Sequence, residues 1–454
     1  MRTHETRYET EEEHLKGKTM STNGRTIQTR LLTLVLVLGC GLTARAYEFA
    51  GGTGEPNDPY QIATIEDLLA VGSSAELLTK HYVLVNDLDL DPNLPGGRVF
   101  DDALIGRLAL DNVTGEWLTP FSGVLDGQGH AIRNLFISCE QGSGVGLIGR
   151  LSGQVRDLHI QNTRISGSAS AMGAIAGFCS DGTILHCSAT GQVSGTTGVG
   201  GILGHLWDGA LVDCRAEVQV QGAKLVGGLF GSSTGGIVSR CEAQGEVRGD
   251  QFVGGLGGHL MNCLIIESRA TGVVMGVDNA GGLLGYTWQG MILRCGAVCE
   301  VTAEQTAGGL IGSALVSGGP IMDCYARGSV AGSLAGGLAG LTSAVPVLSS
   351  YAACEMTPLA SSDGTIAVMG GLFGEARYLS ATQVADCFWD AELSGVSVGA
   401  GSNLVSYGEG LTTERMQQQA TFEQAGWDFR SVWTMAEGEY PALQWESAAD
   451  AAQD

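Results

Sequence analysis

The 454-residue sequence predicts an all-β protein, a right-handed parallel β-helix with about 27 residues per coil. Three observations predict it: a glycine motif that recurs at a fixed step, an alternation of small apolar and charged residues within each repeat, and 71 glycines without long helix-forming runs. Self-similarity at such a period is typical of solenoids, whose repeats stack on one another. Leucine-rich and helical-hairpin repeats have similar periods, but a period-two alternation favours strands.

The glycine motif is clearest at residues 227–231, Gly-Gly-Leu-Phe-Gly. The same pattern begins at Gly200, Gly254, Gly281, Gly308, Gly336 and Gly370, with looser copies at 145–149 and 173–177. The closing glycines fall at 149, 177, 204, 231, 258, 285, 312 and 340, which are steps of 27 or 28 residues. The next step, from 340 to 374, is 34 residues, so the regular period ends there.

Three columns of small residues appear when the repeats are aligned. They are Cys187, Cys214, Cys241, Ser268 and Cys295; Ala189, Ala216, Ala243, Ala270 and Ala297; and Val193, Val220, Val247, Val274 and Val301. The columns are two or four residues apart, so they share one strand face. Small apolar residues suit the narrow, dry interior of a coil, and this face is predicted to point inward.

Charged residues flank the cysteine column, and we place them on the outward face of the same strand. The residue before each cysteine position is His186, Asp213, Arg240, Glu267 or Arg294, and the residue after it is Ser188, Arg215, Glu242, Arg269 or Gly296. If coils stack in register, each charge has opposite charges about 4.8 Å away between strands. Exposed pairs contribute only ~0.2–1 kcal/mol each, so their main effect is to disfavour a register slip.

The Val-Gly-Gly-Leu-Phe-Gly element, followed by a Cys-x-Ala-x-Gly-x-Val strand, resembles the GLUG repeat of secreted and surface-exposed bacterial proteins. Those proteins include adhesins and immunoglobulin A-cleaving metallopeptidases. The resemblance covers about 145–374 and implies a bacterial, secreted, adhesin-like scaffold. It says little about activity, because one fold carries many functions.

The leader and secretory signal peptide are predicted at 1–46, with Met1 or Met20 as the start. Arg25 and Arg30 precede an apolar run at 31–38, too short to span a bilayer, and Ala44-Arg45-Ala46 is a small-x-small cleavage site. This predicts an extracellular or cell-surface location without a transmembrane segment. An alternative is a lipoprotein signal, with a lipid anchor on Cys40.

The N-terminal cap and first strand are predicted at 47–92. Thr64 and Asp67 have the spacing of a capping box, so a short helix begins there and covers the open end of the coil. Residues 82–90 are the first clear strand. The parallel β-helix is predicted at 93–404, with its first full coils at 121–137 and its clearest repeats at 145–374.

The C-terminal cap is predicted at 405–445, an aromatic-rich stretch with a short helix at 412–420. Trp427, Trp433 and Trp445 are expected to pack on the last coil, the alternative being a sugar-stacking surface. Residues 446–454 are predicted to form a disordered tail.

Eleven cysteines follow Cys40, and we predict buried free thiols. Stacked cysteines would lie within disulfide distance, but their parallel side chains are poorly directed for a bond. A zinc site is unsupported because there is no Cys-x-x-Cys; Cys295 and Cys299 are four residues apart and both face inward.

No catalytic constellation is evident, so catalytic and cofactor-binding residues are both predicted to be none. The sequence lacks His-Glu-x-x-His, Gly-x-Ser-x-Gly and a phosphate-binding loop with lysine. The enzymatic alternative is a β-helix polysaccharide lyase or glycoside hydrolase, which needs unpaired carboxylates on an outer sheet. Asp213, Glu242 and Glu267 have arginine neighbours instead.

Asp87, Asp89 and Asp91 are candidate calcium ligands, since they share a face by alternation and Ca²⁺ favours carboxylate oxygens. A solvated strand face explains them equally well. Asp126 and His130 lie in a Gly-x-Gly turn that needs no catalytic role.

The composition completes the functional hypothesis. A formal net charge of −24 argues against nucleic acid and anionic membranes as partners. A regular scaffold without a catalytic constellation favours a secreted or cell-surface repeat protein, structural or adhesive. Its partners are expected to be surface glycans or proteins, bound by outward side chains.

Overall fold

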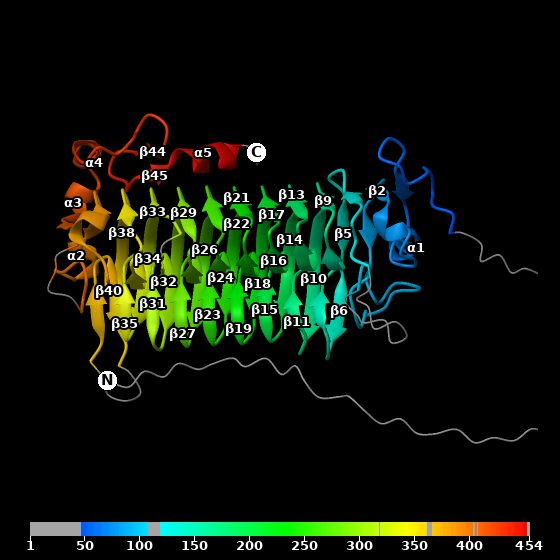
Figure 1. The fold of residues 1–454 in the computed structure, drawn as a ribbon, viewed down its shortest axis with the longest axis horizontal. Coiled ribbons are helices and arrows are strands. Elements are labelled where there is room, and N and C mark those ends of the chain that lie inside the picture. Colours follow the sequence, from blue (N-terminus) through cyan, green and yellow to red (C-terminus); the bar gives the residue numbers. More distant parts are fainter. Residues whose placement is uncertain are drawn as a thin grey trace, which may run out of the picture. The chain divides into compact units, whose positions relative to one another are not determined.

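The computed structural model describes residues 47–107, 119–316, 318–360, 366–402, 405 and 407–451. It confirms a parallel β-solenoid, whose stacked coils are seen from the side in Figure 1. The predicted leader, signal peptide and Cys40 lie outside the described residues. Tyr47–Asp454 is one compact unit.

Each coil passes through four sheets, here numbered 1 to 4. A representative coil follows β14 (Ser188–Ser194) in sheet 2, β15 (Thr197–Gly200) in sheet 3, β16 (Leu203–Trp207) in sheet 4 and β17 (Ala210–Val212) in sheet 1. The next coil begins at β18 (Arg215–Gln221), which pairs with β14 in parallel. Ala189 opposes Ala216 and Val193 opposes Val220, which is the 27-residue register of the sequence repeat.

The strands of the four sheets pair in parallel throughout the described residues. Sheet 1 also contains β1 (Tyr60–Ile62), β2 (His81–Leu84), β4 (Val124–Asp126), β9 (Gln154–Arg156), β13 (Thr183–Leu185), β21 (Ile237–Ser239), β25 (Leu264–Ile266), β29 (Met291–Leu293), β33 (Ile321–Met322), β37 (Val347–Leu348) and β41 (Val384–Ala385). Sheet 2 also contains β3 (Leu88–Asp89), β5 (Ala131–Arg133), β6 (Phe136–Cys139), β10 (His159–Gly167), β22 (Glu242–Arg248), β26 (Arg269–Gly276), β30 (Gly296–Ala303), β34 (Tyr325–Gly332), β38 (Tyr351–Pro358), β42 (Phe388–Asp390) and β43 (Glu409–Leu411).

Sheets 3 and 4 lie on either side of the glycine motif. Sheet 3 also contains β7 (Ser143–Val145), β11 (Ser170–Met172), β19 (Lys224–Gly227), β23 (Gln251–Gly254), β27 (Asp278–Gly281), β31 (Thr306–Gly308), β35 (Leu334–Gly336) and β39 (Val368–Gly370). Sheet 4 also contains β8 (Ile148–Leu151), β12 (Ala176–Ser180), β20 (Phe230–Thr234), β24 (Gly257–Met261), β28 (Leu284–Trp288), β32 (Ile311–Leu315), β36 (Ala339–Ser343) and β40 (Phe373–Arg377).

The glycine motif forms the corner between sheets 3 and 4, where backbones approach most closely. Gly228 donates its N–H to the Gly255 carbonyl at 3.1 Å, and a Cβ on Gly228 would lie 2.1 Å from that oxygen. The same Cβ would lie 3.0 Å from the Cβ of Ala243. The second glycine of each motif therefore packs against the alanine column, which explains why both residues stay small.

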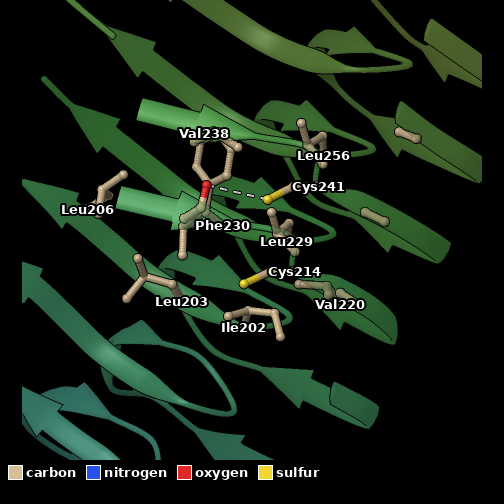
Figure 2. Packing of buried hydrophobic residues seen from close by; sticks show 14 of the residues in the cluster. Ile202, Leu203, Leu206, Cys214, Val220, Leu229, Phe230, Val238, Cys241 and Leu256 are labelled. Atoms are coloured by element: carbon tan, nitrogen blue, oxygen red, sulfur yellow. Dashed lines mark hydrogen bonds between the residues drawn. The ribbon is translucent and has the colours of Figure 1, made fainter. Parts of the chain in front are cut away.

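Leucine, isoleucine, valine and phenylalanine fill the rest of the interior. Figure 2 shows Leu203, Leu206, Leu229, Phe230 and Val238 pointing into the coil, together with the sulfur atoms of the cysteine column. The labelled side chains in this view are almost completely buried. The four sheets thus enclose one continuous dry core along the solenoid, as the small-residue columns predicted.

The corner between sheets 1 and 2 corrects one sequence-based prediction. We placed the charged residues before the cysteine column on the strand that contains the cysteine. Instead, each is a single residue with positive φ that turns the chain between strands: Asp157, His186, Asp213, Arg240, Glu267, Arg294, Asp323, Ser349 and Asp386, with φ between 44° and 55°. One left-handed residue turns the chain and interrupts the alternation at the corner, so that Val212 and Asp213 lie between the inward Leu211 and Cys214.

The N-terminal cap helix is confirmed as α1 (Ile65–Ala70). The Thr64 side chain accepts from the Asp67 N–H, and the Asp67 carboxylate accepts from the Thr64 N–H, which is the predicted capping box. The prediction of one first strand at 82–90 is wrong. The strand β1 precedes α1, and the predicted strand is divided between β2 and β3, which lie in different sheets. A short 3₁₀ helix, η1 (Leu77–Thr79), precedes β2.

The C-terminal end of the interior is closed by Trp389. This residue opposes Ala352 in the alanine column, and its indole lies where a Cβ on Gly371 would stand. Its Nε1–H donates to the Val396 carbonyl at 2.9 Å. The large side chain therefore fills the space that the next coil would occupy. The elements around this end are η2 (Ala381–Gln383), α2 (Ala391–Ser394), α3 (Thr413–Met416) and α4 (Gln419–Gln424).

The chain then runs back beside the coils through β44 (Trp433–Thr434), β45 (Ala442–Leu443) and α5 (Gln444–Ala451), drawn in red in Figure 1. Residues 409–451 are called the C-terminal segment below. Its aromatic cluster packs on outward side chains of the last coils, including Tyr325, Tyr351 and Phe388. The prediction of a disordered tail from 446 is wrong for 446–451, because α5 continues to Ala451 and Glu446 is buried.

Candidate functional site

The outward face of sheet 2 carries a shallow groove, which is the candidate binding site. Its central hollow has a volume of about 430 Å³ and crosses β10, β14, β18 and β22. A hollow of about 290 Å³ adjoins it and shares Arg164, Gln192 and Gln219 with it. Another, of about 230 Å³, shares Gln221 and Arg248 and continues the groove to β26. These three hollows together are called the sheet 2 groove.

Carboxamide side chains form most of its polar lining. Gln192, Gln219 and Gln221 point outward from neighbouring strands and are exposed, and Gln192 donates to Gln219 at 3.0 Å. Asn162 adds a further amide at one end. Each amide offers both donors and acceptors, so the groove can bind a ligand that presents hydroxyl groups in both roles.

Two of the acids that line the groove, Glu217 and Glu246, are paired with arginines; Asp250 also lines it at the β26 end. Arg248 forms an ion pair with Glu246, and Arg215 contacts Glu217 at 2.8 Å. Arg164 lies over the Phe136 ring, 5.8 Å from its centroid, and no carboxylate partner is found for it among the described residues. The groove therefore presents one guanidinium available to a ligand, beside carboxylates that are already engaged.

The charged residues that precede the cysteine column do form ion pairs between coils, as predicted. They do so at the corner between sheets 1 and 2 rather than on a strand. Arg240 donates two hydrogen bonds to Asp213, at 2.6 and 2.7 Å, and Arg294 contacts Glu267 at 2.9 Å. In the neighbouring column of sheet 2, Glu242 lies 3.5 Å from Arg215 and 3.2 Å from Arg269. These pairs link successive coils and leave the three acids with basic neighbours.

The cysteine column has a hydrogen-bonding role that the sequence reasoning missed. The thiol of Cys214 donates to the Val212 carbonyl at 3.3 Å, and the thiol of Cys241 donates to Ser239 at the same distance. Ser268 occupies the next position and donates its hydroxyl to the Ile266 carbonyl at 3.0 Å. The column thus requires a small donor that satisfies a corner carbonyl, and the serine among cysteines was the available signal.

The eleven described cysteines are free and buried, including Cys187 and Cys295. Burial raises the pKa of the Cys299 thiol to about 12 and that of Cys263 to about 11. Because the thiolate is the reactive form, we expect the native thiols to react with an aromatic disulfide reagent at least ~100-fold more slowly than the same thiols in unfolded protein. Spectrophotometric thiol titration with and without denaturant measures this. Rapid reaction of several thiols in the native protein would contradict the burial of these cysteines.

The calcium candidates are engaged by hydrogen-bond donors. Asp87 accepts from the Ala131 N–H at 2.9 Å and contacts Arg133 at 2.7 Å, and these interactions lower its pKa to about 2. Asp89 accepts from the Asn134 side chain at 2.7 Å. Asp91 accepts from the Asn93 side chain, also at 2.7 Å. Within the described ranges, no group of three or more His, Cys, Asp or Glu residues is arranged to hold a metal ion.

Asp126 and His130 do not meet at the turn that contains them. Asp126 forms an ion pair with Arg156 at 2.8 Å, and His130 lies 3.2 Å from Asp87. The turn itself uses Gln128 and Gly129, both at positive φ. Each side chain therefore has a structural partner on a neighbouring coil.

Comparisons with known proteins add two relatives and one structure. No family model matches the chain, so the resemblance to the GLUG repeat stays a prediction. The chain is 34% identical over 145 residues to halomucin of Haloquadratum walsbyi, covering 31% of this chain and 2% of halomucin. It is 33% identical over 108 residues to a protein provisionally named a Gly-rich membrane protein, from Evansella cellulosilytica, covering 23% of this chain and 11% of that one.

The chain therefore spans only a small part of the length of these relatives. A crystal structure provisionally identified as an immunoglobulin A1 protease from Bacteroides ovatus is 17% identical, with a TM-score of 0.43, over 87% of this chain and 95% of that one. Among the helices of the described residues, none is both long and apolar enough to cross a membrane.

Proposed function

We propose that this protein is a secreted or cell-surface β-solenoid without catalytic activity, which binds glycans in the sheet 2 groove. The groove's row of outward amides beside the guanidinium of Arg164 carries the proposal. Halomucin and the Gly-rich membrane protein support a surface context. The signal peptide and GLUG-type repeats predicted from the sequence agree with it.

The shape and chemistry of the groove suit an extended sugar chain. The hollows cross five strands, from β10 to β26, so they are long and shallow rather than a closed pocket. Sugar hydroxyls both donate and accept hydrogen bonds, as carboxamides do. Arg164 can bind a carboxylate on a charged sugar in two-point contact. Sheet edges and small apolar pockets, which peptides commonly use, play no part in this site.

The enzymatic alternative would need two unpaired carboxylates at a suitable separation. Glu217, Glu246 and Asp250 line the groove, but Glu217 and Glu246 have arginine partners, which leaves Asp250 as a single acid. Glu300 and Glu355 point outward from sheet 2 in one column, two strands apart, which corresponds to about 10 Å. Neither lines the groove, so no acid pair faces a ligand bound there.

A Gln192→Ala/Gln219→Ala double variant tests the proposal against a panel of acidic and neutral polysaccharides. Affinity electrophoresis should show at least tenfold weaker binding of the polysaccharide that the wild type retains best, since two carboxamides, with their donors and acceptors, are removed. Gln244→Ala is the matched control, because Gln244 is an exposed glutamine on the same sheet outside the groove. We expect it to bind like the wild type.

Two outcomes would contradict the proposal. One is unchanged binding by the double variant, which would place the ligand elsewhere on the molecule. The other is release of reducing or unsaturated sugar ends from any polysaccharide by the purified protein, which would favour the lyase or hydrolase. A Glu300→Gln/Glu355→Gln variant would then show whether that acid pair is responsible.

A further inference from the structure

Sheet 4 presents a second surface, on a different side of the coil, which is rich in aromatic and histidine side chains. Its outward residues on β12, β16, β24 and β28 are Phe178, His205, Trp207, His259, Tyr286 and Trp288. These side chains are called the aromatic face. Trp207 is 56% exposed and Trp288 is 38% exposed. Exposed aromatic rings gathered on one face are typical of surfaces that contact a ligand or partner.

The strand register sets the spacing of the rings. Trp207, Thr234, Met261 and Trp288 occupy one column on successive strands. The two tryptophans are therefore three strand spacings apart, about 14 Å. Thr234 lies between them on β20 and supplies a hydroxyl group, whereas the neighbouring Ser232 is buried and hydrogen-bonded to the ring of His205. Along the solenoid axis, the two tryptophan rings are thus separated by the hydroxyl of Thr234 and the thioether of Met261.

The rings form two packed clusters. In the first, His205 lies 5.9 Å from Phe178 and 6.3 Å from Trp207. In the second, His259 stacks on Tyr286 at 5.3 Å, and Phe252 of sheet 3 packs on Tyr286 at 4.9 Å. Neighbouring rings restrict one another's rotamers, so the Trp207 ring is held by His205 before a ligand arrives.

The backbone beside the second cluster is strained. Phe252 and Leu225 both have φ of +56°, in a column where Gly198 and Asn279 adopt the same conformation. Glycine and asparagine accept positive φ readily, whereas bulky side chains do not. The strain places the Phe252 ring against His259 and Tyr286, 6.1 Å and 4.9 Å away.

The face carries no charge. Between β12 and β28 its outward positions on sheet 4 contain no Asp, Glu, Lys or Arg. Burial lowers the pKa of both His205 and His259, so the imidazoles are neutral at neutral pH. In a protein with a net charge of −24, this uncharged surface is suited to an uncharged ligand and gives no attraction to a charged one.

We propose that the aromatic face is a second binding surface, which takes a neutral polysaccharide whose sugar rings stack on Trp207 and Trp288. The C–H groups on one side of a pyranose ring pack against an aromatic ring, while its hydroxyls reach side-chain hydrogen-bonding groups at the edge. His205 and Thr234 provide those groups beside the tryptophans. The proposal is independent of the sheet 2 groove, because the two surfaces share no residue.

Single Trp207→Ala and Trp288→Ala variants and their combination test the proposal with soluble neutral polysaccharides: a mixed-linkage β-glucan, a xylan and a galactomannan. Polygalacturonate serves as the charged comparison. For at least one neutral polymer, we expect each single variant to bind at least tenfold more weakly and the double variant to lose binding in affinity electrophoresis. Ligand addition should also change the tryptophan fluorescence of the wild type, and this change should vanish in the double variant.

Val298→Ala is the matched control, because Val298 is an apolar residue that is 42% exposed on β30 of sheet 2, outside the face. It should bind like the wild type, and all variants should keep the wild-type melting temperature. The proposal is overturned if the double variant binds the neutral polymers unchanged, if the wild type binds none of them, or if the face instead joins two copies of the chain. Self-association would appear as a dimer in sedimentation that the double variant loses.

The Gln192→Ala/Gln219→Ala variant separates this proposal from that of the sheet 2 groove. It should keep its affinity for neutral polymers that bind the aromatic face. Loss of that binding in the groove variant, with retention in the Trp207→Ala/Trp288→Ala variant, would assign the neutral ligand to the groove and overturn the proposal made here.

Discussion

A Gly228→Val variant is expected to lose at least about 3 kcal/mol of stability and to unfold in two steps instead of one. A Cβ at this position would lie 2.1 Å from the Gly255 carbonyl oxygen, which accepts the Gly228 N–H. The added atoms would also press on Ala243 across the coil. The substitution therefore forces adjacent coils apart and breaks a hydrogen bond between them.

Unfolding in two steps is expected because of the way a solenoid is built. Coils contact their neighbours only, so the coupling between the two halves of the array passes through each interface in turn. Disrupting the interface at Gly228, near the middle of the coils, lets the halves unfold at different denaturant concentrations. Chemical denaturation followed by circular dichroism measures both the midpoint and the number of transitions.

Gly129→Asn is the control for this prediction. Gly129 has φ of +78° and nothing within 4 Å of an added Cβ, and asparagine tolerates that conformation. We expect this variant to unfold like the wild type. If Gly228→Val also kept a single transition with an unchanged midpoint, close packing at the glycine motif would not determine coil stacking.

The sequence period was sufficient to predict the stacking because every coil repeats the same contact. Ala216 opposes Ala243, and Val220 opposes Val247, as the alignment of repeats required. The turn residues were not recognised, since a single left-handed residue such as Asp213 leaves the alternation of side chains intact on either side. Glycine or asparagine at that position would have signalled the turn.

The surfaces were harder to predict than the core. Inward positions repeat because they share one environment, but outward positions differ from coil to coil. Gln192, Gln219 and Glu246 occupy equivalent positions, and only the arrangement of neighbouring side chains makes a hollow there. Two tyrosines, Tyr325 and Tyr351, stand where earlier coils have charged residues, and this change was a readable signal that another segment covers them.

Arg327→Ala is expected to release the C-terminal segment from the solenoid. The Arg327 side chain donates to the Tyr351 hydroxyl at 2.6 Å, to the Tyr440 carbonyl at 3.2 Å and to the Pro441 carbonyl. Its guanidinium also lies 4.8 Å from the Tyr325 ring centroid and 5.7 Å from those of Tyr351 and Tyr440. It thus joins two coils to the segment that packs on them.

The free energy that holds the C-terminal segment on the solenoid is expected to fall by about 3 kcal/mol, because the variant leaves buried acceptors unpaired and removes the cation–π contacts of the guanidinium. Limited proteolysis should cut within 409–451 at least tenfold faster than in the wild type, while the solenoid stays intact. Arg327→Lys should give an intermediate rate of cleavage. An ammonium keeps the positive charge, but it lacks the planar set of N–H donors with which the guanidinium reaches several acceptors at once. Arg377→Ala is the control, because Arg377 is exposed and pairs with Glu375 on its own strand.

The pH dependence of this release should depend on Glu446, which is buried and accepts from the Tyr325 hydroxyl at 2.7 Å. Burial raises the pKa of its carboxyl, and the nearby Arg327 opposes that rise. A carboxyl whose pKa is higher in the folded than in the unfolded state binds more protons when folded, so docking strengthens as the pH falls through the interval between the two pKa values.

Removing Arg327 should raise the pKa of Glu446 further and widen that interval. The Arg327→Ala variant should therefore recover part of its protease resistance when the pH is lowered from 8 toward 5, by a larger factor than the wild type gains. An acid-resistant protease active across this range, with Arg377→Ala as reference, allows the comparison. Equal pH dependence in the two variants would show that the guanidinium does not act on the Glu446 carboxylate, and that ring packing alone holds the segment.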